Sequence, residues 1–483
     1  MVMKHHSKFW IVRISCVIIV GFVLTSATYA QVVVFHNANV IDGTGDDVLH
    51  DAVVVVDNST ITCVGKLEDC NDYTNTDETE WVDLSGHWVI PGLIDLHFHL
   101  VYEENPDFSS VLRAGVTTVQ ETGPTNASDD GEYEIGHGQV ERLAELADRI
   151  ERGEILGPRM QYCGPQMFSI DEPYDGIPRM LGLRSGDDIS EVVNYMAERG
   201  ASCIKLISGV SPEHRKDLLT AASDRGLRGL GHSTTALSIE KQLSFPWSQI
   251  HHFWIPSSEM LPAELRERLP ENSSLAHYHA GLSLFDPDTP ETLSFVEKVA
   301  ATDIAWVPTL AGAYAFPWGL EVAYWWDLIH QEATAGDSVL IHEALVGSDF
   351  SSEVPVDTLD VLHRPFVNFA TTLTRMLFEA GVPILAGSDS NYGSKSYILQ
   401  DELEYLVTAG LTPMDAIMAA TSKAAKAIGM EHQIGTIAPG NLADFVVLEK
   451  NPLDDIRNIR SVRKVVLNGN ILTSLIGQPE EKN

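Results

Sequence analysis

The residues with the clearest chemical potential are two histidines that lie two positions apart. His97 and His99 close an apolar run that begins at residue 89. Side chains alternate between the two faces of a β-strand, so both imidazoles point to the same side. Imidazole is a common ligand of divalent transition metals. The spacing therefore predicts a pair of metal ligands, with two hydrogen-bonded structural histidines as the alternative.

Other residues that bind metal or move protons also close predicted strands. They are Lys205, His232, His252 and Asp389. Imidazole and carboxylate groups bind metal ions directly, and a lysine beside metal ligands can react with carbon dioxide to give an anionic carbamate that bridges two cations. Taken alone, Lys205 would more often form a salt bridge. Together with the histidine pair, these residues predict a metal-dependent active site.

The elements that must position these residues follow a repeating pattern. The predicted strands span residues 89–99, 115–121, 158–164, 202–208, 228–232, 249–254, 303–309 and 382–389. The predicted helices span residues 139–152, 188–199, 212–225, 291–301, 366–380, 396–409 and 413–428. This alternation predicts an α/β fold, a (β/α)8 TIM barrel, whose active site lies at the carboxyl ends of its strands. The alternative, a doubly wound open sheet, lacks support because no GxGxxG motif follows the first strand.

Three further histidines are expected to lie outside this site. His277 and His279 repeat the spacing of two, but their polar, Ser- and Asn-rich surroundings favour a surface lid. His251 directly precedes His252, so on one continuous strand it must face away from the site, into the barrel wall or the helix layer.

The first thirty residues resemble a secretory signal peptide. Lys4, Lys8 and Arg13 precede an apolar stretch over residues 14–24, and small residues follow up to Ala30. The stretch is shorter than the about 20 residues of a membrane-spanning helix. We therefore expect cleavage, no stable membrane insertion, and export to the periplasm or the extracellular space.

Short β-branched segments lie near both ends of the remaining chain. They are residues 32–35, 39–41 and 53–56, and residues 445–448 and 462–467. We expect these ends to pair into a small β-sandwich beside the barrel. The predicted domains are a signal peptide at 1–30, the sandwich halves at 31–88 and 431–483, and the barrel at 89–430.

Composition limits the partners. The chain has 483 residues, with 32 basic and 68 acidic side chains and a formal net charge of −36. Such a polyanion repels phosphate backbones, so nucleic acid is not an expected partner and a small molecule or peptide is. Whether the chain forms a homo-oligomer is not decided by its composition.

Cys63 and Cys70 are either bridged by a disulfide, as export permits, or two buried thiols.

Several motifs together resemble the amidohydrolase superfamily. One is Val-Ile-Pro-Gly-Leu-Ile-Asp-Leu-His-Phe-His at 89–99, and another is Gly-Thr-Ile-Ala-Pro-Gly-Asn-Leu-Ala-Asp at 435–444. Between them lie Ile204-Lys205, Gly231-His232, Ile250-His251-His252 and the Leu-Ala-Gly-Ser-Asp of 385–389. The likeness spans residues 35–475 and is nearest to the imidazolonepropionase-like group that includes Xaa-Pro dipeptidases.

This resemblance implies a hydrolase of carbon–nitrogen bonds with two divalent metal ions, most often zinc. It implies His97, His99 and Asp389 as ligands of the first ion, His232 and His252 as ligands of the second, and a carboxylated Lys205 as the bridge. Imidazolonepropionase itself uses one metal without this lysine, so Lys205 favours the peptidase-like branch. His251 departs from the pattern, since relatives usually carry Glu there.

The implied reaction is hydrolysis of an amide bond in a dipeptide, Xaa-Pro or similar, or in an N-acyl amino acid. A metal-bridging hydroxide would attack the carbonyl carbon, with Asp389 as general base and then general acid. Alternatives are hydrolysis of a carbamate, a lactone or a phosphoester by the same site. An inert binding scaffold is a further alternative, against which the complete set of six ligand positions argues.

Substrate contacts are expected on loops after the strands, and their residues are not determined. Aromatic side chains crowd the loops after the sixth and seventh strands, where packing and pocket lining are both open: Trp254, Trp306, Tyr314, Phe316, Trp318, Tyr324, Trp325 and Trp326. A substrate carboxylate would need a cation, for which Arg159, Arg179 and Lys395 are unranked candidates.

Overall fold

The computed structural model describes most of the chain after its first thirty-one residues. The described residues are 32–74, 79–100, 105–123, 139–169, 180–234, 236–253, 255–267, 281–282, 284–315, 356–391 and 399–472. In this part of the chain, no helix combines the length and the apolar character needed to span a membrane. The predicted signal peptide lies outside the described residues.

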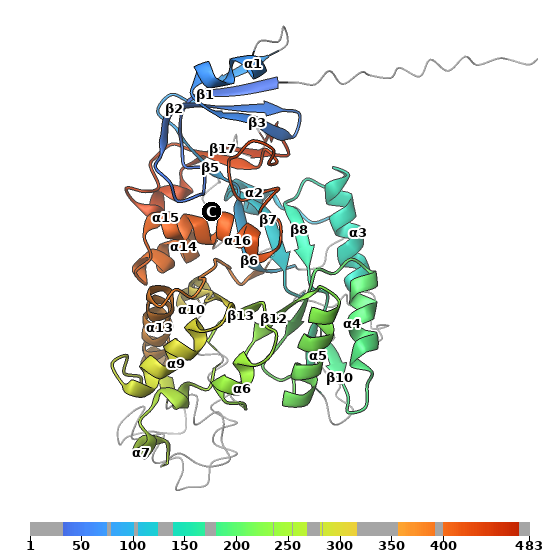
Figure 1. Cartoon of the computed structure of the whole chain (residues 1–483), viewed down its shortest axis with the longest axis vertical. Helices are drawn as coiled ribbons and strands as arrows, with labels where there is room; N and C mark the ends of the chain where they lie inside the picture. Colours follow the sequence, from blue (N-terminus) through green and yellow to red (C-terminus); the bar gives the residue numbers. More distant parts are fainter. Residues whose placement is uncertain are drawn as a thin grey trace, which may run out of the picture.

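Strands from both ends of the chain form one eight-stranded sheet. Its order is β18-β17-β16-β5-β1-β2-β3, with β4 also paired to β1. The strands are β1 (Val32–Val40), β2 (Leu49–Asp57), β3 (Thr60–Gly65), β4 (Glu80–Asp83), β5 (Trp88–Pro91), β16 (Phe445–Leu448), β17 (Val462–Leu467) and β18 (Asn470–Ile471). The two ends of the chain meet in this sheet through β5 and β16, which are antiparallel neighbours, although residues 89–91 of β5 were predicted as part of the first barrel strand. The blue and red strands lie together at the top of Figure 1.

Turn residues explain the hairpins of this sheet. Asn468 (φ 48°) and Gly469 (φ 78°) connect β17 to β18, and both have the left-handed backbone that a tight two-residue hairpin requires. Valine-rich β1 and β2 supply much of the core, in which the Phe35 ring meets Phe445 of β16 edge to face at 5.0 Å. The two ends of the chain are therefore connected by a shared hydrophobic core and by the hydrogen bonds between their strands.

Two parallel sheets form the central part of the fold. One has the order β15-β6-β7-β8, and the other has the order β10-β9-β11-β12-β13-β14. The strands of the first are β6 (Leu93–His99), β7 (Val116–Glu121), β8 (Arg159–Tyr162) and β15 (Ser390–Asn391). The strands of the second are β9 (Gln166–Ser169), β10 (Met180–Leu183), β11 (Cys203–Leu206), β12 (Arg228–His232), β13 (Gln249–His251) and β14 (Ala305–Val307).

The predicted strand at 89–99 is wrong as one continuous element. Pro91 ends β5, which belongs to the eight-stranded sheet, and β6, which belongs to a parallel sheet, begins at Leu93. Gly92 lies between them where a Cβ atom would come within 2.1 Å of Thr117 Oγ1, so the chain changes sheet at a position that only glycine fits. Strands β9 and β10 were not predicted at all.

Hydrogen bonds connect the edges of the two parallel sheets. Leu385 N donates to Trp306 O of β14 at 2.9 Å, and Ala386 O accepts from Leu96 N of β6 at 3.1 Å. The segment predicted as the eighth strand thus lies between β14 and β6. On the other side of the first parallel sheet, Ser202 N, directly before β11, donates to Tyr162 O of the edge strand β8 at 3.0 Å.

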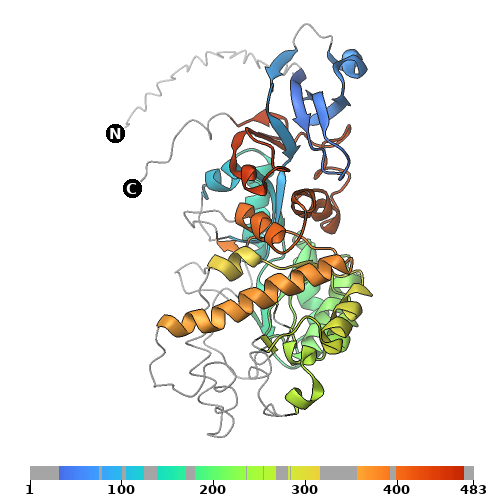
Figure 2. The same cartoon turned by 90° about the vertical axis from the view of Figure 1, so that its left-hand side faces the viewer.

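Helices cover the parallel sheets, and all seven predicted helical segments contain one. The helices are α2 (Ser109–Arg113), α3 (Gln139–Glu151), α4 (Ile189–Glu198), α5 (Pro212–Asp224), α6 (Ile239–Leu243), α9 (Pro290–Ala300), α10 (Leu310–Ala315), α13 (Val356–Glu379), α14 (Leu399–Thr408), α15 (Pro413–Ala419) and α16 (Ser422–Ala427). Shorter elements are η1 (Leu67–Cys70), α1 (Asn71–Thr74), η2 (Ser257–Met260), α7 (Ala263–Arg266) and η3 (Ile456–Arg460). Helix α13 packs against α9, α10 and α14 (Figure 2).

Capping residues set where several helices begin. Ser211, Thr289 and Thr412 each accept a hydrogen bond from a first-turn N–H, and each precedes a proline. A hydroxyl cap followed by proline suits a helix start, because proline lacks the N–H that would otherwise stay unpaired there.

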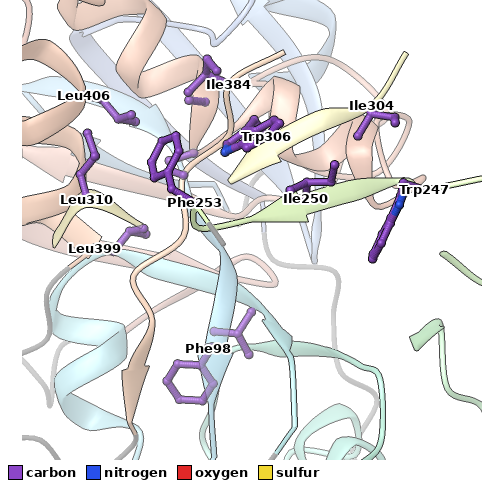
Figure 3. Packing of buried hydrophobic residues seen from close by; sticks show 14 of the residues in the cluster. Phe98, Trp247, Ile250, Phe253, Ile304, Trp306, Leu310, Ile384, Leu399 and Leu406 are labelled. Atoms are coloured by element: carbon purple, nitrogen blue, oxygen red, sulfur yellow. The ribbon is translucent and has the colours of Figure 1, made fainter. Parts of the chain in front are cut away.

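Side chains of the strands and of the covering helices form the core between them. Trp306 of β14 packs on Phe253 at 5.9 Å between ring centroids, beside Leu310 of α10 and Leu399 of α14 (Figure 3).

Two disulfides are present among the described residues. Cys63 is bonded to Cys70, which decides between the two alternatives for this pair. Cys163 is bonded to Cys203, which the sequence did not predict because these residues are 40 positions apart. They meet because β8 and β11 are neighbours.

Candidate metal centre

Five of the six residues predicted as metal ligands lie at or near the carboxyl ends of parallel strands, and the sixth, Asp389, follows the segment that lies between β14 and β6. His97 and His99 end β6, Lys205 lies on β11, and His232 ends β12. His252 directly follows β13, and Asp389 directly precedes β15. Strands of two sheets thus contribute to one region.

Three of these side chains converge on one point. His99 Nε2 and His97 Nε2 lie 3.1 Å and 3.3 Å from Asp389 Oδ1, and the two nitrogens are 3.1 Å apart. Two imidazoles and one carboxylate are a donor set that divalent transition metals favour. His97, His99 and Asp389 therefore fit a metal ion, with three ligand atoms within 4.8 Å of one another.

Backbone geometry directs Asp389 into this group. Its φ of 55° is left-handed, which is uncommon for a residue other than glycine, and its N–H donates to His97 O at 2.8 Å. Two positions earlier, a Cβ on Gly387 would lie 2.6 Å from Val307 Cγ1 and 2.7 Å from His97 Cβ. The close approach of Gly387 to β6 brings the Asp389 carboxylate to the histidine pair.

Asp95 supports the same arrangement, and the sequence reasoning missed it. This buried carboxylate accepts hydrogen bonds from His97 N at 3.0 Å and from Ser388 N at 2.9 Å. Asp95, His97 and His99 share one face of β6, so the alternation that identified the histidines could also have identified this residue.

Lys205 is fully buried beside the histidine pair. Its Nζ lies 3.4 Å from His97 Nε2 and 3.2 Å from His251 Nδ1. Burial lowers the pKa of Lys205 to about 7, although Asp389 and Glu121 act in the opposite direction. A substantial neutral fraction therefore exists near neutral pH, and the neutral amine is the form that reacts with carbon dioxide.

The prediction that His251 faces away from the site is wrong. His251 is buried with Nδ1 2.8 Å from His97 Nδ1. Strand β13 ends at His251, so the alternation that was applied to both histidines stops before His252. His252 has a left-handed φ of 59°, and this turn brings both neighbouring imidazoles into the same region.

His232 and His252 form a second group of donors. Their ring centroids are 4.8 Å apart, and His252 Nε2 lies 3.9 Å from Asp389 Oδ2. The Thr309 hydroxyl donates to Pro308 O at 2.7 Å, so its oxygen accepts from His252 Nδ1 at 2.5 Å. With its proton on Nδ1, His252 keeps the lone pair of Nε2 free on the side of Asp389.

Burial keeps these imidazoles neutral, which is the form that binds metal. It lowers the pKa values of His97, His232 and His251 well below the usual range, and that of His252 to about 4. The nearby Lys205 adds to the effect in all four, whereas Asp389 opposes it at His252.

Two buried glutamates near the centre were also missed. Glu121 Oε2 accepts from Gly123 N at 3.0 Å, and Gly123 O lies 2.6 Å from His99 Nδ1, so this loop holds the ring of His99. Glu402 Oε2 accepts from Ala311 N at 2.6 Å. Burial raises the pKa of Glu121 to about 7 and that of Glu402 to about 8. Glu402 lies in an ordinary amphipathic helix pattern, so its sequence carries no distinguishing signal.

The described residues exclude two of the expected substrate contacts. Arg159 begins β8, at the end opposite the metal centre, and its Nη2 pairs with Asp444 Oδ2 at 3.3 Å. Trp306 is fully buried, and its Nε1 donates to His252 O at 2.9 Å. The side chains of the other candidates lie outside the described residues: Trp254, Tyr314, Phe316, Trp318, Tyr324, Trp325, Trp326, Arg179 and Lys395, as do His277 and His279.

Comparison with known proteins agrees with this architecture. A model of the amidohydrolase family matches residues 369–472. An imidazolonepropionase of Symbiobacterium thermophilum is 26% identical over 390 residues, which cover 77% of each chain. The crystal structure of a Xaa-Pro dipeptidase superposes with a TM-score of 0.60 and 18% identity over 91% of this chain and 99% of that one. That of Aspergillus niger ochratoxinase superposes with a TM-score of 0.62 and 18% identity over 92% and 95%.

These matches support membership of the chain in the amidohydrolase superfamily. Its homologues are hydrolases that act on carbon–nitrogen bonds, and it is an enzyme of this broad class.

Proposed function

We propose that this chain is an exported, dinuclear metal-dependent amidohydrolase that cleaves an amide bond in a dipeptide, Xaa-Pro or similar, or in an N-acyl amino acid. The observation that carries the proposal is the convergence of His97, His99 and Asp389 next to Lys205. Similarity to a Xaa-Pro dipeptidase and to an imidazolonepropionase supports the choice of an amide substrate.

The donor groups fit two cations. His97, His99 and Asp389 would hold the first, His232 and His252 would hold the second, and a carboxylated Lys205 would lie between them. Zinc is the proposed metal, because neutral imidazole and carboxylate are its usual ligands in catalytic sites. Such ions, when bound, polarise the scissile carbonyl and lower the pKa of a water molecule.

Asp389 is the proposed general base and acid. Its Oδ1 faces the histidine pair, whereas its Oδ2 lies on the side of His252, and the side chain is 26% exposed. Burial raises the pKa of Asp389, but His252 and His99 lower it more, so the carboxylate is ionised at neutral pH. It can accept the proton of the attacking water and deliver it to the amine that leaves as the carbon–nitrogen bond breaks.

The fold proposal follows from the edge hydrogen bonds. We propose that β6, β7, β8, β11, β12, β13, β14 and residues 382–389 form a closed (β/α)8 barrel, which begins at Leu93 rather than at the predicted residue 89 and extends to residue 430. Residues 31–88 and 431–483 would form the accompanying β-sandwich, and residues 1–30 a signal peptide removed on export. The bonds from Leu385 to β14 and from β6 to Ala386 support the closure.

A metal and substrate assay tests this function. The chain is purified without chelator and with bicarbonate, its zinc content is measured by elemental analysis, and a panel of dipeptides and N-acyl amino acids is screened. We expect close to two ions per chain and hydrolysis of at least one amide class. A single ion per chain, or loss of zinc without loss of hydrolysis, would contradict the dinuclear mechanism.

A further inference from the structure

His97 has a neighbour at each of its two ring nitrogens. Nε2 faces His99, Asp389 and the Lys205 amine, and Nδ1 lies 2.8 Å from Nδ1 of His251. Two imidazole nitrogens at this distance form a hydrogen bond only when one carries a proton and the other does not. The position of that proton decides which nitrogen of His97 has a free lone pair.

A backbone carbonyl starts a chain of hydrogen bonds that settles this position. Gln120 Nε2 lies 2.8 Å from Leu96 O and 3.0 Å from Gln249 Oε1. A carbonyl oxygen only accepts, so the Gln120 atom facing it must be the amide nitrogen. That nitrogen donates its second proton to Gln249, whose oxygen is therefore fixed as the acceptor.

Gln249 in turn fixes the proton of His251. The same Oε1 atom lies 3.0 Å from His251 Nε2, which must therefore carry a proton. Neutral His251 then has its lone pair on Nδ1, which faces His97 Nδ1 at 2.8 Å and the Lys205 amine at 3.2 Å. The shorter of the two contacts is the one in which it accepts from His97 Nδ1. Gln120, Gln249, His251 and His97 are all fully buried, so bulk water does not compete for these bonds.

We propose that Gln120, Gln249 and His251 are positioning residues that hold His97 as the Nδ1–H tautomer and present its Nε2 lone pair to the first cation. This inference rests on the proposed metal role of His97, but the tautomer itself is a property of the metal-free chain. Partners that fix the tautomer of a ligand histidine change metal affinity, by about 10- to 100-fold when they are removed.

The experiment compares three variants with the natural chain. Gln249→Leu removes the acceptor, whereas Gln249→Glu keeps an acceptor oxygen for both Gln120 and His251. Thr118→Val is the matched control, because Thr118 lies two residues before Gln120 on β7 and its buried hydroxyl has no hydrogen-bond partner among the described residues. Zinc affinity is measured by competition with a chromophoric chelator, and the His97 tautomer by nitrogen-15 shifts of ring-labelled histidine in the metal-free protein.

We expect Gln249→Leu to lose about 10- to 100-fold in zinc affinity and to shift His97 away from the Nδ1–H tautomer. The zinc affinities of Gln249→Glu and Thr118→Val should stay within about threefold of the affinity of the natural chain. If Gln249→Leu does not fold, Gln120→Met is used instead. It removes the first side chain of the hydrogen-bonded series and must give the same loss of zinc affinity and the same shift of the His97 tautomer.

The two proposals fail in different ways. Unchanged zinc affinity in Gln249→Leu, an equal loss in Gln249→Glu, or a proton on Nε2 of His97 in the metal-free natural chain would overturn the positioning role. A natural chain that shows the Nδ1–H tautomer but binds no zinc supports the positioning role and contradicts the proposed function alone.

Discussion

Asp95 accepts two hydrogen bonds from Ser388, one from its backbone N–H at 2.9 Å and one from its hydroxyl at 2.5 Å. The same carboxylate accepts from His97 N at 3.0 Å. One buried side chain therefore connects a histidine of the metal centre to the residue directly before Asp389, across 293 positions of sequence.

Replacing this carboxylate should affect both stability and turnover. Asp95→Asn turns one accepting oxygen into a donor that faces other donors, which costs about 1–3 kcal/mol of unfolding free energy for a buried unpaired group. We expect kcat to fall more than KM changes, since Asp389 would shift. Urea unfolding and steady-state kinetics measure these effects. Ser388→Ala, which removes only the hydroxyl bond, should have a smaller effect on both, and equal effects would argue against a central role for Asp95.

Asp389→Asn tests the proton-transfer role. The amide cannot accept the proton of the attacking water, so kcat should fall by about 100-fold or more. Some metal should remain bound, because an oxygen still faces His97 and His99. Asp303→Asn is the control, as Asp303 is exposed and lies before β14 at the opposite end from the metal centre. Near-natural turnover in Asp389→Asn would remove Asp389 from this role.

The alternation of side chains was sufficient to find the histidine pair, because β6 extends through both residues to His99. It failed at His251, because β13 ends there and His252 adopts a left-handed backbone. Local pattern rules have no access to such a turn, which tertiary packing imposes. The strand boundary at Gly92 was missed for a similar reason, since the close approach of Thr117 is a contact between strands.

Contacts between distant strands were beyond prediction from one sequence. Gln120 and Gln249 are 129 positions apart, and nothing in their local sequence distinguishes them from surface glutamines. The disulfide between Cys163 and Cys203 likewise depends on the neighbourhood of β8 and β11. The helices were predicted well, because amphipathic spacing and Ser/Thr-Pro starts are local signals.

Lys205→Ala tests the bridging carbamate. The variant should lose metal or activity, and short carboxylic acids should restore part of the activity by supplying an anionic bridge in the space left by the side chain. Elemental analysis and amide hydrolysis, each with and without added acetate, provide the measurements. Lys423→Ala is the control, since Lys423 lies on α16 and pairs with Asp415 at 3.4 Å. Full activity of Lys205→Ala without acetate would contradict the carbamate.

Glu402 predicts a pH dependence of stability. Burial raises its pKa in the folded chain from 4.5 to about 8, so in this window the folded state holds a proton that the unfolded state has lost. The protonated Glu402 carboxyl stabilises the folded chain fully below the pKa of the unfolded chain, and this stabilisation is lost as the pH rises through the pKa of the folded chain. Glu402→Gln cannot ionise and does not lose stability in this way. Its unfolding free energy relative to the natural chain should therefore grow from pH 5 to pH 8.5, by a few kcal/mol at about 1.4 kcal/mol per pH unit. Denaturant unfolding at several pH values measures this difference, and Glu297→Gln on the exposed face of α9 should show no such trend. A difference independent of pH would contradict the raised pKa.

Arg215 and Arg228 form a matched pair for testing how β12 supports His232. Arg215 is fully buried and Arg228 is partly buried, and burial lowers the pKa of each to about 10. Arg215 donates to His232 O at 2.5 Å and to Ile207 O at 2.9 Å, at the carboxyl ends of β12 and β11. Arg228 begins β12 and donates to Ser202 Oγ at 2.8 Å, at the opposite end.

Arg215→Met should therefore weaken both stability and the second metal site, because it frees the backbone that carries His232. Arg228→Met should reduce stability without changing the metal content, since its bonds lie a full strand length away. Both losses of stability should be about 1–3 kcal/mol, the cost of leaving buried hydrogen-bonding groups unpaired. Zinc content per chain and urea unfolding separate the two effects. Equal zinc content in both variants would show that β12 holds His232 in place without Arg215.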